Sequence, residues 1–236
     1  MKVMALLALA CVLCFPRSGF GQDRQTVVDK YFQAIGGKER WLSIRSKFDS
    51  ILFVEYKRGT AADSSRLATV FVRPNLQKTT VYKKAAHPVT MGFDGHVFWS
   101  QGSTIKLVQS EEEAAYFKST VMLGQADLLL EDDVMISYKG MKELDDRQFE
   151  VLEIKRNQWV SSYQYYFDQK SGLLYCAVAH ESPNKRRTYF KEYRSVSGLL
   201  VPFVETTTID GITQDRSHRL AFKFDQPVNN EIFKSK

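Results

Sequence analysis

Cysteine is scarce in this sequence, and its placement excludes an internal disulfide framework. The 236-residue chain has three cysteines, and two of them, Cys11 and Cys14, lie near its start. If the first 21 residues are removed as a signal peptide, only Cys176 remains, so no disulfide can form within the chain. Stability must then come from buried apolar side chains, which one β domain of about 200–250 residues can supply.

Motifs for catalysis and metal binding are also missing. None of the four histidines has a metal-binding spacing such as His-x-x-x-His, and there is no Gly-x-Ser-x-Gly elbow or phosphate-binding loop. Adjacent acids at Asp132-Asp133 and Asp145-Asp146 fall at element ends, where carboxylates commonly serve turns. Cys176 lies in an apolar strand pattern, which favours a buried thiol over a nucleophile. We therefore expect no catalysis, no metal and no cofactor.

Charge gives little support for a nucleic-acid partner. The chain has 33 Lys and Arg against 27 Asp and Glu, a formal net charge of +6. The densest basic run, Lys185-Arg186-Arg187, follows the turn residues Pro183-Asn184 and is typical of a solvated hairpin tip. Binding of a polyanion favours a broader basic face than this.

The first residues have the pattern of a secretory signal peptide. Lys2 provides a positive charge, Val3–Phe15 is almost wholly apolar, and the small residues Gly19 and Gly21 precede a cut after Gly21. The apolar run is shorter than the roughly 20 residues that a membrane-spanning helix needs. The pattern therefore predicts an exported protein that does not span the membrane.

The predicted organisation is a cleaved signal peptide over residues 1–21 and one domain over residues 22–236. One alternative stays open at the leader. Cys11 or Cys14 could carry the lipid of a bacterial lipoprotein, which would give an anchored envelope form.

Strand patterns occupy most of the domain. Asp94-Gly95 predicts a tight hairpin, and the last third of the chain reads as a meander with turn residues at regular spacing. The pattern indicates one large antiparallel sheet in a mainly β fold. The predicted strands are residues 48–57, 67–73, 78–83, 104–108, 134–139, 148–156, 159–168, 173–181, 186–193, 199–209 and 212–224.

Two helical segments are predicted to cover this sheet. Residues 25–35 carry an apolar stripe and end at Gly36-Gly37, and residues 110–122 begin with a capping box. Residues 48–57 carry apolar groups on both faces of the strand. A sheet with two apolar faces must curl around something or be covered, because a solvated face would be polar.

Ordered motifs resemble the superfamily of LolA and LolB, periplasmic proteins of outer-membrane lipoprotein sorting. Residues 27–44 (VVDKYFQAIGGKERWLSI) resemble the opening helix of that group, and residues 92–99 (GFDGHVFW) are similar to its Asp-Gly hairpin. Residues 138–154 resemble its Tyr-x-Gly hairpin. Its late strands are matched by residues 165–174 and 191–211.

This resemblance implies an unclosed β-barrel, or half-barrel, with helices across its concave face. It further implies a periplasmic protein that holds lipid or lipoprotein acyl chains without catalysis. We expect this protein to be a monomer. Two alternatives stay open: a sensor or interaction module that uses the same fold to bind an envelope protein, and an enzyme of unknown class.

Aromatic side chains are the candidates for lining such a cavity. The chain has 16 Phe, 11 Tyr and 3 Trp, most of which are expected in the core. Methionine is added because its flexible thioether suits adaptable apolar surfaces. The predicted lining residues are Phe53, Phe71, Trp99, Phe117, Met122, Tyr165 and Phe167.

Overall fold

The computed structural model describes residues 20–84, 86–102, 105–107, 121–156, 162–180 and 185–234. Nearly all of the predicted signal peptide, including Cys11 and Cys14, lies outside the described residues. So does most of the predicted helix at 110–122, with Phe117.

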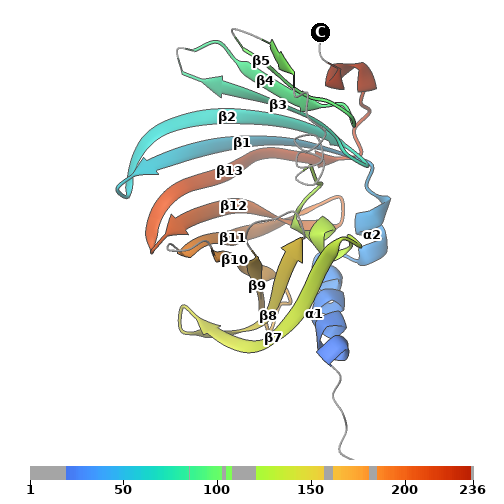
Figure 1. Cartoon of the computed structure of the whole chain (residues 1–236), viewed down its shortest axis with the longest axis vertical. Helices are drawn as coiled ribbons and strands as arrows, with labels where there is room; N and C mark the ends of the chain where they lie inside the picture. Colours follow the sequence, from blue (N-terminus) through green and yellow to red (C-terminus); the bar gives the residue numbers. More distant parts are fainter. Residues whose placement is uncertain are drawn as a thin grey trace, which may run out of the picture.

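A single antiparallel sheet dominates the described part of the chain (Figure 1). Its strands are β1 (Ser46–Lys57), β2 (Thr60–Val72), β3 (Leu76–Lys83), β4 (Val89–Phe93), β5 (Phe98–Gln101), β6 (Ile105–Leu107), β7 (Val134–Leu144), β8 (Arg147–Arg156), β9 (Tyr163–Asp168), β10 (Leu174–His180), β11 (Lys185–Val196), β12 (Leu199–Ile209) and β13 (Ile212–Phe224). Their order is β6-β5-β4-β3-β2-β1-β13-β12-β11-β10-β9-β8-β7. Because β6 and β7 lie at opposite ends of this order, the barrel is unclosed, which confirms the predicted fold class.

Several strands are longer than their sequence patterns indicated, and β2 and β7 differ most. β2 begins at Thr60 rather than at residue 67, because its first residues are polar and exposed and give no apolar alternation. They still pair with the end of β1, where Asp63 lies opposite Glu55. β7 continues past Gly140, which has a φ of 78°, and the pairing register with β8 shifts there.

The helices are α1 (Phe20–Ala34), α2 (Lys38–Ser43) and two short 3-10 helices, η1 (Gln125–Leu129) and η2 (Asn230–Phe233). The predicted apolar stripe of α1 is buried, including Val27, Tyr31 and Ile35. α1 begins at Phe20 rather than at residue 25, because residues 23–26 are exposed and carry no periodic apolar signal.

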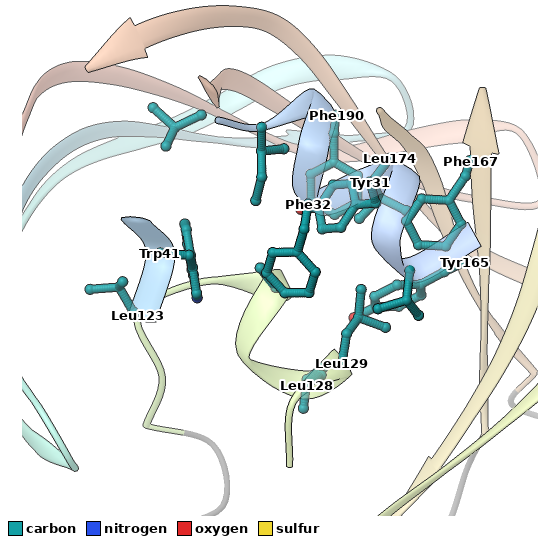
Figure 2. Close-up of a cluster of buried hydrophobic side chains, with 14 of the residues drawn as sticks. Tyr31, Phe32, Trp41, Leu123, Leu128, Leu129, Tyr165, Phe167, Leu174 and Phe190 are labelled. Atoms are coloured by element: carbon teal, nitrogen blue, oxygen red, sulfur yellow. The ribbon is translucent and has the colours of Figure 1, made fainter. Parts of the chain in front are cut away.

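α1 packs on one face of the sheet, which we call the helix face. Figure 2 shows Tyr31 and Phe32 of α1 among side chains from the strands, including Phe167 and Leu174. The rings of Tyr31 and Phe167 meet edge to face, with centroids 5.2 Å apart. Aromatic pairs in this geometry contribute about 0.5–1.5 kcal/mol beyond the area they bury.

The opposite face, which we call the outer face, carries a second apolar cluster. Phe149, Val151 and Cys176 are fully buried there, while their strand neighbours point to the helix face. Burial raises the pKa of the Cys176 thiol to about 12, so the thiolate needed for nucleophilic chemistry does not form at neutral pH. The sheet therefore carries buried apolar side chains on both faces over β8–β10.

The end of α1 is fastened to the turn between β11 and β12. The backbone N–H of Leu200 donates to the carbonyl oxygen of Ile35 at 2.9 Å. Gly36 has a φ of 110°, and a Cβ built on it would lie 2.3 Å from the carbonyl oxygen of Gly198. Only glycine allows the helix to end against this turn.

This close approach gives a matched test of the helix anchor. Gly37 also has a positive φ, of 105°, but a Cβ built on it meets no atom within 4 Å. We expect Gly36→Ala to lower the free energy of unfolding by about 1–3 kcal/mol more than Gly37→Ala, because only the first adds an overpacked contact. Urea denaturation of both variants measures the difference. Equal effects would show that backbone strain alone matters at this turn.

Candidate functional site

A cavity of about 210 Å³ lies on the helix face, beside the end of α1. It is bounded by α1, α2, the segment 122–125 and strands β1 and β10–β13. Its walls are formed by Tyr31, Ile35, Trp41, Lys47, Met122, Leu123, Gly124, Gln125, Leu174, Phe190, Tyr193, Leu200, Val201, Pro202, Glu205, Arg219 and Phe222.

One side of the cavity is apolar. Ile35 and Tyr31 come from the last turns of α1, while Phe190 and Leu200 come from the strands that face them. Ligand sites for small molecules are typically lined in this way, with a few polar groups that fix orientation. This wall can therefore hold a hydrocarbon segment.

The other side carries a cluster of charged side chains centred on Arg219 of β13. Its guanidinium donates to Asp49 Oδ2 at 3.2 Å, to Glu205 Oε1 at 2.7 Å and to the carbonyl oxygen of Pro202. Burial alone would lower the pKa of Arg219, but the two carboxylates raise it. Burial raises the pKa of Asp49, against the opposing effect of Arg219 and Lys47.

Lys47 of β1 reaches the same cavity next to this cluster. Its Nζ donates to the carbonyl oxygen of Leu123 at 2.8 Å and lies 5.9 Å from the ring centroid of Phe71. Burial lowers the pKa of Lys47, and the charge of Asp49 partly offsets that effect. The cavity thus joins an apolar wall to a wall that can hydrogen-bond.

Asp127 of η1 holds the segment that covers part of the cavity. Its Oδ1 accepts from Trp41 Nε1 at 2.7 Å and from Arg73 Nη2 at 2.8 Å, and its Oδ2 accepts from the Leu123 N–H at 2.6 Å. One buried carboxylate therefore ties α2 and the residue that follows β2 to η1 and the segment before it. Charge-assisted hydrogen bonds of this kind are roughly twice as strong as neutral ones.

The structure brings some of the predicted lining residues to the helix face. Met122 lines the cavity, and Phe71 is buried beside Lys47. Tyr165 and Phe167 are buried in the core that includes α1, so contact with a ligand there would require α1 to move. Phe53 lies further along β1 and is partly exposed. Their role in ligand contact stays a prediction.

Two further candidates are placed elsewhere. Trp99 pairs with Gly92 of β4. The next residue of β4, Phe93, pairs with Gln77 of β3, which in turn pairs with Phe71 on the helix face. Neighbouring residues of a strand point to opposite faces. Trp99 therefore points to the outer face, where its Nε1 donates to the carbonyl oxygen of Phe233 at 2.5 Å. The structure does not bring it to the cavity. Phe117 lies outside the described residues.

Sequence reasoning missed the charged wall. Arg219 and Glu205 lie in long strands with many polar residues, so nothing in the pattern separates them from solvated positions. The sequence did contain a clue to Asp49. It lies two and four residues before Ile51 and Phe53, so it falls on the same face of the strand as these apolar residues. A charge in such a position is buried only when it is paired.

The described residues give no sign of a metal centre. Among them, no group of three or more His, Cys, Asp or Glu side chains gathers at one place. In the same part of the chain, none of the helices has the length and apolar character to cross a membrane.

The Arg219 cluster generates a pH-dependent prediction. Arg219→Met leaves Asp49 and Glu205 without their cation, so we expect the free energy of unfolding near neutral pH to fall by about 3–5 kcal/mol. Without Arg219 the pKa of folded Asp49 rises further. A carboxyl with a raised folded pKa stabilises the fold below its unfolded pKa of about 3.9 and loses that contribution as pH rises through the folded pKa. The deficit should therefore shrink as pH falls towards about 4.

Urea denaturation at several pH values measures this deficit. Arg194→Met is the matched control, because Arg194 forms an exposed ion pair with Glu192 and its loss should cost little at any pH. A deficit for Arg219→Met that stays constant with pH would contradict the assignment of a buried, paired carboxyl.

Solved structures share this fold at low sequence identity. A LolA superfamily protein from Nitrosomonas europaea matches with a TM-score of 0.65 and 11% identity, over 90% of this chain and 97% of that chain. A DUF1329 family protein from Desulfovibrio piger matches with a TM-score of 0.62 and 8% identity, over 90% and 97%. A structure described as an outer membrane lipoprotein-sorting protein domain, from Vibrio parahaemolyticus, matches with a TM-score of 0.59 and 8% identity, over 90% and 94%.

No protein-family model matches the sequence, and no curated protein matches it significantly. The structural matches agree with the resemblance inferred from the ordered motifs, and at this level of identity they establish the fold. Over 90% of its length, the chain therefore shares its fold with a LolA superfamily protein and with a structure described as an outer membrane lipoprotein-sorting protein domain.

Proposed function

We propose that this protein is an exported, periplasmic carrier that holds an acyl chain of a lipid or lipoprotein on its helix face. The observation that carries the proposal is the cavity beside α1, with an apolar wall from Ile35, Phe190 and Leu200. The lipoprotein-sorting domain that shares the fold supports the same class of cargo. The chemistry required is binding and release, for which an apolar wall suffices.

The size of the cavity indicates how a chain would lie. Its volume of about 210 Å³ is below the range of about 300–1,000 Å³ for drug-sized ligand sites, so it accommodates only part of a long acyl chain. Each buried methylene contributes about 0.8 kcal/mol before ordering costs. The remaining methylenes would lie along the helix face of β1 and β2.

That part of the helix face has suitable side chains. Ile51 pairs with Arg219 of the cavity on one side and with Leu67 of β2 on the other, and Phe53 follows two residues further along β1. Ile51, Phe53 and Leu67 are all partly exposed. An acyl chain that leaves the cavity here would cover this apolar surface, and Phe53 would be among the side chains that contact it.

Filling the cavity tests the proposal directly. Leu200→Trp places a larger side chain in the cavity, and we expect it to weaken binding of a fluorescent fatty acid by at least about tenfold. Leu220→Trp is the matched control, because Leu220 is exposed and does not line the cavity. Fluorescence titration of delipidated protein, purified without detergent, measures both affinities.

Equal loss of affinity in both variants, or none in either, would place the bound chain outside this cavity. If the delipidated wild-type protein binds no acyl ligand at all, the carrier proposal fails. Circular dichroism and urea denaturation of both variants establish that the comparison is between folded proteins.

A further inference from the structure

Lys47 is held differently from the other cation of the cavity. Arg219 is bound by two carboxylates and a backbone carbonyl, which use all three of its nitrogens. Among the described residues, no carboxylate oxygen lies within 4.0 Å of Lys47 Nζ. The hydrogen-bond acceptor that these residues offer it is the carbonyl oxygen of Leu123. A partly buried ammonium in a low-polarity wall is costly unless it is paired.

The geometry leaves room for one more partner at Lys47. An ammonium has three N–H donors, and acceptors among the described residues use one of them. The side chain borders the cavity, so its remaining donors can meet a group bound there. The apolar wall of Ile35 and Leu200 borders the same space, so a molecule bound there can meet both.

We propose that Lys47 binds the anionic head group, a carboxylate or a phosphate, of a single-chain amphiphile whose hydrocarbon lies against the apolar wall. This inference rests on the proposed function and adds the chemical class of its ligand. It assigns Lys47 the task of orienting the ligand with its head towards β1 and the 122–125 segment. Charge-assisted hydrogen bonds to an anionic oxygen are short and strong, so the head group would be selected by contact.

The other charges make the inference more specific. Glu205 also lines the cavity, and together with Asp49 its negative charge balances the positive charges of Arg219 and Lys47. An anionic head is therefore attracted by Lys47 and repelled by Glu205. Removing either side chain's charge should change the preference for anionic ligands in opposite directions, a result that loss of structure cannot produce.

Competition with a neutral, polarity-sensitive dye tests this on the folded, delipidated protein. The competitors are dodecanoate, dodecyl phosphate and dodecanol, each below its micellar concentration, which share one chain and differ in the head group. For the wild type near neutral pH, we expect at least one anion to displace the dye at about a tenth of the dodecanol concentration. Comparison of the two anions distinguishes a fatty-acid source from a phosphate-headed lipid.

Three variants accompany this measurement. Lys47→Met should bring the anion and dodecanol to equal affinity while dodecanol still binds, and Glu205→Gln should widen the preference. Lys142→Met is the matched control, because Lys142 is also partly buried with one side-chain hydrogen bond, to Gln164 Oε1 at 3.0 Å, and does not line the cavity. If Lys47→Met does not fold, Lys47→Gln removes the charge and keeps a donor for the Leu123 carbonyl.

The outcomes separate the two proposals. If all three competitors displace the dye equally from the wild type, the head-group inference is wrong while the carrier proposal stands. If Lys47→Met lowers the affinity for dodecanol and the anions by the same factor, Lys47 only tethers the 122–125 segment and the inference is overturned. If none of the competitors displaces the dye, the carrier proposal itself fails.

A pH series on the wild type gives an independent readout. Burial lowers the pKa of Lys47, and the charge of Arg219 adds to that effect, while the charges of Asp49, Asp127 and Glu205 oppose it without cancelling it. The ammonium therefore loses its proton below the ordinary lysine range. The preference for dodecanoate over dodecanol should therefore decline as pH rises through that lowered pKa, while dodecanol binding stays constant. A preference that is unchanged up to the ordinary lysine pKa of about 10.4 would contradict an ionic role for Lys47.

Discussion

Packing of α1 against the helix face determines where the cavity of this protein lies. Tyr31 and Phe32 cover the side chains of β9 and β10, and the helix then stops at Gly36 because the Gly198 carbonyl leaves no room for a side chain. The cavity begins at that point, beside Tyr31 and Ile35. The sheet is wide and open, and α1 lies along only part of it (Figure 1). Apolar side chains beyond the end of α1 therefore line the cavity.

Charged side chains fasten the strands where helix packing ends. Arg219 of β13 joins Asp49 of β1 to Glu205 of β12, and Asp127 holds the covering segment through Trp41 and Arg73. Buried ion pairs add little net stability over apolar packing, but breaking one is costly, so they favour one arrangement over its alternatives. In this protein the same charges also form one wall of the cavity, which makes the site amphipathic.

Local patterns predicted the fold well and the site poorly. The alternation in β1, the α1 stripe and the Asp94-Gly95 turn report local backbone preference and burial, and each appears in the structure. Which face of a strand looks inward depends on register across many strands. Trp99 shows the limit: its aromatic character suggested a lining residue, and pairing with Gly92 turns it to the outer face. Lys47 and Arg219 line the same cavity because β1 pairs with β13, which no local pattern records.

The measurement that tests the account most directly is a crystal structure of the mature protein with dodecanoate bound. We expect hydrocarbon density between the end of α1 and β11–β13, in contact with Ile35, Phe190 and Leu200, with the carboxylate near Lys47 Nζ. Density for the ligand on another surface, with this cavity closed by its own side chains, would contradict it.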